Sequence, residues 1–258
     1  MTKHIVPCWP LLLIAACIGP MIAADETAEK GRAVFEQYKD TVVTIRTVLS
    51  MSMGGNPQER ESEANGTVID AMGLAVLSLS SVDPSGLMAR LDRGRDEMVT
   101  KITSMKMILA DGTELDAEIV LRDADLDLAF VRPLTKPDSA MPFVDLTQPG
   151  KPEILDEVVA IAQLGQVARR THSALVERVE AVVDRPRTFY VLGEHRSRAV
   201  VCSPAFTLDG AFVGIGVFRS IQGSDRRTGD NVLIVIVSGD DIREASAQVP
   251  PWPETTER

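Results

Sequence analysis

The sequence predicts an all-β protein built from two antiparallel β-barrels, with a short helix near each end. Many short segments are rich in Val, Ile and Thr and are separated by Gly, Pro or Asp-Gly turns, which is the pattern of successive antiparallel strands. This pattern occurs twice, on either side of a segment that contains Pro133, Pro137 and Pro142. A chain of 258 residues has room for two such domains.

In the first half, a polar segment with Val34, Phe35 and Tyr38 predicts a lead-in helix over 25–40. The segment 52–65 holds Gly, Pro and many charges, and we expect a loop there. The segment 83–106 is charged without a clear period, and we expect a surface insertion with some helix. The strands predicted between these segments are 41–48, 66–70, 74–79, 107–109, 114–121 and 126–132.

The second half predicts a further set of strands, a closing helix over 238–247 and a polar tail. Its strands are expected at 157–162, 173–184, 189–192, 199–202, 206–207, 211–217 and 232–237. These predictions divide the chain into an export segment at 1–24 and a lead-in helix at 25–40. The first barrel follows at 41–136, the second at 137–248 and a polar tail at 249–258.

The N-terminus predicts export from the cytoplasm. Lys3 is followed by an apolar run that ends in small residues at Ala24, before Asp25, which is typical of a cleaved signal peptide. Two alternatives stay open. Cys17 follows an Ile-Ala-Ala triplet that resembles a lipoprotein cleavage box, which would give a lipid anchor, or the segment could remain as an uncleaved anchor. Each places the folded part in the periplasm, outside the cell or on a membrane.

Charge and cysteine content exclude several classes of protein. The formal net charge of −10 disfavours nucleic acid as a partner, because phosphate backbones would be repelled. After cleavage at Ala24 only Cys202 would remain, so no intrachain disulfide can form. With His172 and His195 as the remaining histidines of that chain, we expect no zinc site, and we predict no cofactor.

Five segments, in this order and spacing, resemble the HtrA/Deg branch of the trypsin-like serine proteases. Residues 64–73 (ANGTVIDAMG) are similar to that family's glycine-flanked hydrophobic run, and 111–129 (DGTELDAEIVLRDADLDLA) to its hairpin and D-L-A strand. Residues 157–162 are similar to the strand before its specificity region, 189–215 to its nucleophile loop and following hairpin, and 231–242 to its closing strand and helix.

The resemblance covers roughly residues 35–244 and implies the chymotrypsin double-barrel fold, without the family's usual C-terminal PDZ domain. It also implies a chemistry in which a serine attacks the carbonyl, a histidine accepts its proton and an aspartate orients the histidine. The residues that match these positions can be read directly from the sequence.

The resemblance implies a degenerate triad. Asp127 begins the D-L-A triplet and matches the family's aspartate, but Ser80 stands at the histidine position, and a one-residue slip gives Ser81. Val201 stands at the serine position. That alignment runs without gaps through Pro204, Asp209, Gly210 and Gly214.

The loop that would form the oxyanion hole is also altered. Ala199, Cys202 and Ser203 replace the family's glycines around Val200, and glycine is the residue that adopts such loop geometry freely. An alternative register would make Cys202 or Ser203 the nucleophile. A cysteine nucleophile still needs a base or another group that lowers its pKa, and Ser80 offers none.

The resemblance and these replacements predict a non-catalytic protease homologue, or pseudoprotease, that binds protein or peptide partners or acts as a scaffold. One alternative is a divergent serine- or cysteine-type endopeptidase with a rearranged active site. Another is an envelope structural protein whose inter-barrel cleft is filled. The sequence leaves the partner's identity and the oligomeric state open.

Overall fold

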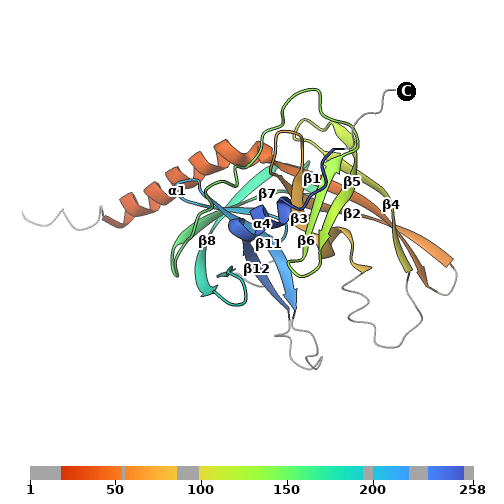
Figure 1. Ribbon diagram of the computed structural model, residues 1–258. Helices are drawn as coiled ribbons and strands as arrows, with labels where there is room; N and C mark the ends of the chain where they lie inside the picture. The colour runs from red at the N-terminus through yellow and green to blue at the C-terminus, as the bar shows by residue number, and fades with distance from the viewer. Residues whose placement is uncertain (1–18, 54–55, 86–98, 194–199, 221–231, 253–258) are drawn as a thin grey trace, which may run out of the picture.

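A computed structural model describes residues 19–53, 56–85, 99–193, 200–220 and 232–252. Its strands form two closed, six-stranded antiparallel barrels, accompanied by a few short helices (Figure 1). The predicted all-β fold of two barrels is therefore confirmed. The connecting segment leaves the first barrel at Pro133 and enters the second at Glu157.

The first barrel closes in the order β1-β2-β3-β6-β5-β4. Its centre is filled by fully buried apolar side chains such as Ile45, Leu77 and Met107, which come from strands with the β-branched and aliphatic content that a pleated sheet favours. A single helical turn, α2 (Leu79–Val82), follows β3. The strands are β1 (Val42–Met53), β2 (Asn56–Val68), β3 (Ala75–Ser78), β4 (Val99–Ile108), β5 (Glu114–Asp123) and β6 (Leu128–Pro133).

The second barrel closes in the order β10-β11-β12-β9-β8-β7. A short 3-10 turn, η2 (Gln166–Ala168), joins β7 to β8. Gly214 in β11 has φ +154°, and a Cβ there would lie 1.8 Å from the carbonyl oxygen of Val237, so the two strands require glycine at this position. The strands are β7 (Glu157–Gln163), β8 (His172–Val183), β9 (Phe189–Leu192), β10 (Pro204–Thr207), β11 (Phe212–Ser220) and β12 (Val232–Ser238).

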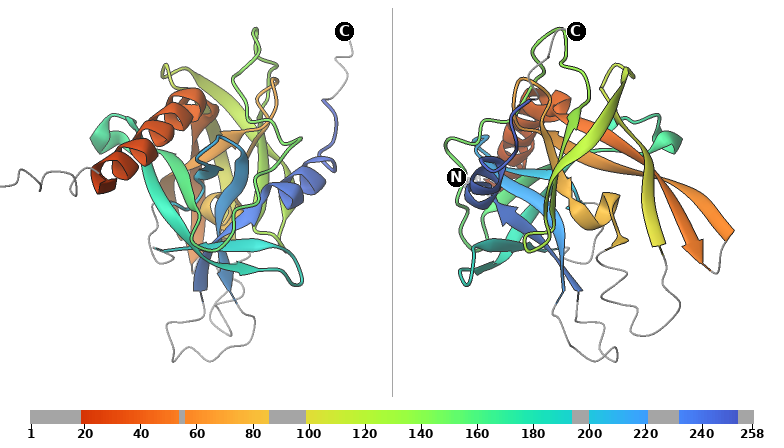
Figure 2. Two further views of the ribbon diagram at one scale, coloured as in Figure 1. Left: turned by 90° about the vertical axis from the view of Figure 1, so that its left-hand side faces the viewer. Right: turned by 45° about the vertical axis from the view of Figure 1, so that its right-hand side comes forward.

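The predicted loop over 52–65 is wrong, because β2 begins at Asn56. Its polar residues pair with β1 along the whole strand, from Asn56 opposite Met53 to Thr67 opposite Val42. The hairpin reaches beyond the barrel (Figure 2, right), where strand pairing needs no apolar alternation. The hydrophobic pattern therefore carried no strand signal.

Two further boundary predictions are corrected. Strand β4 starts at Val99, so the last part of the predicted 83–106 insertion is barrel strand, whereas 86–98 lies outside the described residues. The strand predicted at 199–202 is not formed over its described residues, because Val201 makes only an isolated bridge to Gly216. The next strand, β10, starts at Pro204.

The N-terminal helix α1 (Gly19–Tyr38) packs on the second barrel, although a 3-10 turn, η1 (Lys39–Thr41), leads it directly into the first (Figure 1). The Tyr38 ring stacks on Phe206 at 4.2 Å between centroids, and its hydroxyl donates to the Gly210 carbonyl oxygen at 2.9 Å. Val34 is buried in the core that these residues share. The helix therefore covers one side of the second barrel.

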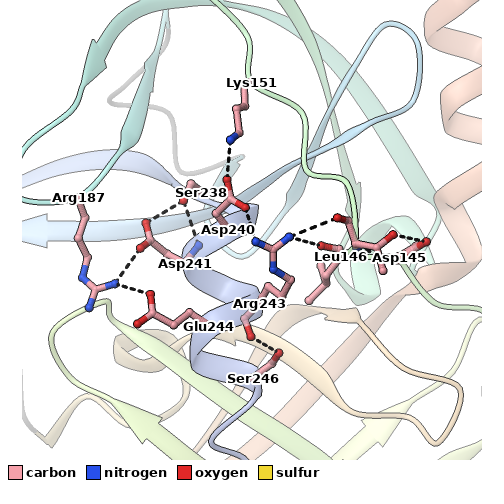
Figure 3. Close-up of polar contacts among 11 residues, drawn as sticks. Asp145, Leu146, Lys151, Arg187, Ser238, Asp240, Asp241, Arg243, Glu244 and Ser246 are labelled. Carbon is pink, nitrogen blue, oxygen red and sulfur yellow. Dashed lines mark hydrogen bonds and ion pairs between the residues drawn. The ribbon is translucent and has the colours of Figure 1, made fainter.

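The C-terminal helix α4 (Gly239–Ser246) is tied down at its first turn (Figure 3). The Ser238 hydroxyl oxygen accepts the Asp241 N–H at 3.2 Å, which is the N-cap contact that satisfies an unpaired helix amide. Arg187 pairs with Asp241 at 2.8 Å. Arg243 donates to the carbonyl oxygens of Leu146 and Thr147 in the segment that connects the two barrels, called the linker here. The helix thereby fastens the linker to the second barrel.

The predicted polar tail is structured at its start. The Arg132 guanidinium donates to the Pro250 carbonyl oxygen at 3.0 Å. The same guanidinium lies 4.8 Å from the centroid of the Trp252 ring, a cation–π contact. The chain therefore returns from the second barrel to the surface of the first.

Candidate functional site

Four of the sequence-predicted site residues gather where the two barrels meet. Asp127 immediately precedes β6, and Ser80 lies in α2 after β3, so both come from the first barrel. Val201 and Cys202 come from the segment before β10 in the second barrel. Cys202 packs with the buried side chains of the first barrel's core, which brings the two halves of the site into contact.

The Asp127 carboxylate is surrounded by hydrogen-bond donors. Ser80 donates twice, from its N–H to Oδ1 at 2.9 Å and from its hydroxyl to Oδ2 at 3.0 Å. The Ser78 hydroxyl donates to Oδ2 at 2.6 Å, and the N–H of Phe218 in β11 donates to the same oxygen at 3.3 Å. The Asp127 carboxylate is therefore occupied by two serines and a backbone amide, whereas the resemblance would have it orient a histidine.

Burial governs the protonation of this carboxyl. Desolvation raises the pKa of Asp127 above its usual value, and the hydrogen bonds from Ser78, Ser80 and the Phe218 amide oppose that rise only in part. The residue also has φ 57°, a left-handed conformation that aspartate tolerates better than most residues. The hydrogen bond from the Phe218 amide shows that the carboxylate faces the second barrel.

The segment Val200–Ser203 is held by backbone hydrogen bonds, one within the segment and one to β11. The Cys202 N–H donates to the Gly216 carbonyl oxygen at 2.8 Å, and the Ser203 N–H donates to the Val200 carbonyl oxygen at 3.1 Å. These two amides are therefore not free to bind an oxyanion. Ala199, the remaining predicted member of this loop, lies outside the described residues.

Cys202 is not placed as a nucleophile. Its side chain is 2% exposed, and burial raises the pKa of its thiol to about 11 despite hydrogen bonding to Ser81 and the Ser78 backbone. Its backbone has φ 63°, at a position where the resembled family has glycine. Ser203 is fully buried. A cysteine nucleophile reacts as its thiolate, and any nucleophile must be accessible to substrate. Cys202 meets neither requirement, and Ser203 does not meet the second.

The described histidine, His172, lies away from this cluster. It begins β8, and its Nε2 is 3.4 Å from the carbonyl oxygen of Val42 at the start of β1. His195 and His4 fall outside the described residues. Within the part of the chain that the structure describes, no histidine contacts Asp127, Ser80 or Cys202.

A cavity of about 350 Å³ opens between the barrels beside this cluster. Its described lining comes from both barrels and combines uncharged polar and apolar residues with a single carboxylate, Glu63. Val201 and Cys202 form part of its wall. The lining also includes Ser62, Ala64, Asn65, Ser81 and Gln163.

Gln163 joins the two barrels at the edge of this cavity, and sequence reasoning missed it. Its Oε1 accepts from the Thr44 hydroxyl at 2.5 Å, and its N–H donates to Asn65 Oδ1 at 3.2 Å. Close by, Arg170 pairs with Glu63 at 2.5 Å. The available signal was a polar residue at the end of the apolar run 158–162, where a buried side chain must find a partner.

Comparison with known proteins does not assign the chain to a family. The chain matched none of the protein-family models scanned, and a search of curated proteins found no significant relative. Among the residues that the structure describes, no cluster of His, Cys, Asp and Glu is arranged to hold a metal ion. None of the described helices combines the length and the hydrophobicity needed to cross a bilayer.

Proposed function

We propose that this chain is a non-catalytic homologue of the trypsin-like serine proteases, of HtrA/Deg type, which is exported from the cytoplasm and binds protein or peptide partners. The observation that carries the proposal is the contact between Ser80 and Asp127. A serine hydroxyl that donates to the carboxylate cannot accept a proton usefully near neutral pH. Among the residues that the structure describes, the site therefore has an orienting carboxylate and no histidine to act as the base.

Two further observations support the absence of catalysis. Val201, at the position of the nucleophile, carries no reactive atom, and the glycines of the resembled family's loop are replaced by Ala199, Cys202 and Ser203. In hydrolases of this kind, the loss of the serine or the histidine alone costs about 10⁶-fold in turnover. The residual rate depends largely on the oxyanion hole, whose two amides would fall at Ala199 and Val201, in a loop that lacks those glycines.

The open cavity supports binding over a purely structural role. A filled cleft would leave only the outer surface for contacts, whereas a hollow of about 350 Å³ lined by both barrels has the size of a small ligand or side-chain site. Its hydroxyl, amide and carboxylate groups suit the polar backbone of a peptide.

The test is a pair of covalent probes applied to the native chain. We expect no labelling by a fluorophosphonate, which reports an activated serine, and no hydrolysis of casein. With a pKa of about 11, roughly one Cys202 thiol in a thousand is ionised at pH 8. Iodoacetamide should therefore modify the Cys202 peptide only after denaturation, as read by mass spectrometry. Rapid native labelling of Cys202 or of any serine would favour a divergent endopeptidase and refute the proposal.

A further inference from the structure

Within the described part of the chain, strand β2 has an unpaired edge, called its free edge here, next to the cavity. It pairs with β1 from Asn56 to Thr67, but on its other side it pairs with β3 only at Thr67 and Val68. Along Gln58–Ala64, the described residues provide no second strand and no backbone hydrogen bond on that side. Unpaired strand edges are templates for adding another extended chain.

The edge leads directly into the inter-barrel cavity. Ser62, Glu63, Ala64 and Asn65 all line that cavity, so the end of the free edge is part of its wall. The edge ends where Gln163 of the second barrel bonds to Asn65. A chain added along β2 would therefore run from the projecting hairpin (Figure 2, right) toward the cavity, with its last side chain at the mouth.

The charges along this edge indicate the chemistry of its occupant. Glu59, Glu61 and Glu63 alternate along the strand and therefore share one face. Glu63 is paired with Arg170, but Glu59 and Glu61 are exposed and have no ion-pair partner in the described part of the chain. Their cross-strand neighbours on β1 are the uncharged Ser50 and Val48.

We propose that the free edge of β2, over Gln58–Ala64, binds an extended segment of a partner protein that carries Lys or Arg at alternate positions. Alternate cationic side chains would lie beside Glu59 and Glu61, and the strand backbone would complete the hydrogen bonding of β2. A second copy of this chain is a poor occupant, because pairing two β2 edges would place like carboxylates side by side. The overall net charge of −10 favours the same class of partner.

This inference rests on the proposed peptide-binding function and assigns its partner class. The probe is a short fluorescein-labelled peptide that alternates lysine and threonine, titrated against the full chain and read by fluorescence anisotropy. Two backbone analogues carry N-methyl groups on alternate residues, one on the lysines and one on the threonines. A strand that pairs through one edge should lose binding with one analogue and keep it with the other.

The charge contribution is tested on the protein. Surface charge pairs contribute modestly, so the double variant Glu59→Gln with Glu61→Gln should weaken binding about three- to tenfold. The control is Glu29→Gln with Asp138→Asn, which changes the net charge equally in α1 and in the linker and should leave the affinity unchanged. Circular dichroism confirms that each variant is folded.

Three results would overturn the inference. One is equal loss of affinity in both double variants, which would show unspecific attraction to an acidic protein. Another is equal binding of both N-methylated analogues, which would exclude strand pairing. The third is a dimer in solution that excludes the peptide, which would assign the edge to a second copy. If neither this peptide nor any member of a random peptide library binds, the proposed peptide-binding function itself fails.

Discussion

At the scale of single residues, the Asp127 carboxyl connects the two barrels and carries a pH dependence. Desolvation raises its pKa in the folded chain, more than the hydrogen bonds from Ser78 and Ser80 lower it. A carboxyl whose pKa is higher in the folded than in the unfolded state binds its proton more tightly when folded. The stability that Asp127 contributes is therefore fully present at pH values below its pKa in the unfolded chain. It is lost as the pH rises through its pKa in the folded chain.

We expect Asp127→Asn, which imitates the protonated form at every pH, to be more stable than the parent chain at pH 7. The difference in the free energy of unfolding should shrink as the pH falls toward the range in which aspartate is protonated. Urea unfolding at pH 7 and pH 4 measures this, with the exposed neighbour Asp125→Asn as the control. A stability difference that grows on acidification would show that the hydrogen bonds outweigh burial.

The aromatic contact of Tyr38 predicts a second effect at this scale. Tyr38→Phe removes only the hydrogen bond to the Gly210 oxygen and should lower the free energy of unfolding by about 1 kcal/mol. Tyr38→Ala also removes the stacking on Phe206 and should cost about 3 kcal/mol. Urea titration of both variants separates the two contributions. Equal losses would mean that the stacked ring contributes nothing.

At the scale of elements, helix α4 depends on its N-cap (Figure 3). Ser238→Ala removes the acceptor for the Asp241 amide and should destabilise the chain by about 1 kcal/mol. Ser246→Ala is a matched control, because its hydroxyl only donates to the Arg243 carbonyl oxygen at the other end of the same helix. Thermal unfolding of the two variants compares them. A larger loss for the control would argue against capping as the source of the stability.

Sequence patterns predicted the elements that lie in the barrel walls. The apolar run 232–237 and the Asp111-Gly112 turn correspond to β12 and to the β4–β5 turn, because burial imposes a hydrophobic signature and tight turns impose glycine. The same patterns failed for Asn56–Asn65 in β2. That segment is held by pairing with β1, and the side chains of Gln58–Asn65 are exposed or half-buried on both faces, so the composition resembles that of a loop.

At the scale of the whole molecule, polar contacts couple the two barrels. The Thr44 hydroxyl and Gln163, which are 119 residues apart, form a buried hydrogen bond. Gln163→Ala would leave that hydroxyl unsatisfied, which should cost about 2 kcal/mol. Gln166→Ala, which removes only an exposed contact to Glu63, should cost less than 0.5 kcal/mol, as is usual for surface substitutions.

Hydrogen exchange followed by mass spectrometry measures this coupling. In the parent chain we expect β1 and β11 to lose protection together, as parts of one cooperative unit. In Gln163→Ala the two strands should open at different denaturant concentrations. Separate opening in the parent chain would show that the barrels are independent despite their contacts.

The candidate site was only partly predictable from the sequence. Asp127 and Val201 could be placed because Asp-Gly turns and a short D-L-A motif fix their positions along the chain. The partners of Asp127 could not, because the Phe218 amide is 91 residues away and its approach depends on how the barrels pack. The Gln163 contacts depend on the same packing. Contacts within one segment can be predicted from the local sequence pattern, whereas contacts between distant segments cannot.

Each end of the chain is fastened to the barrel formed by the opposite half. Tyr38, before the first barrel, stacks on the second, and Trp252, after the second barrel, lies on Arg132 of the first. Synthesis proceeds from the N-terminus, so α1 cannot make its stacking contact before β10 has been synthesised, and Arg132 cannot make its contact before Trp252 has been synthesised. The first half of the chain therefore cannot complete its set of contacts on its own. The two barrels must be present together before either reaches its final structure.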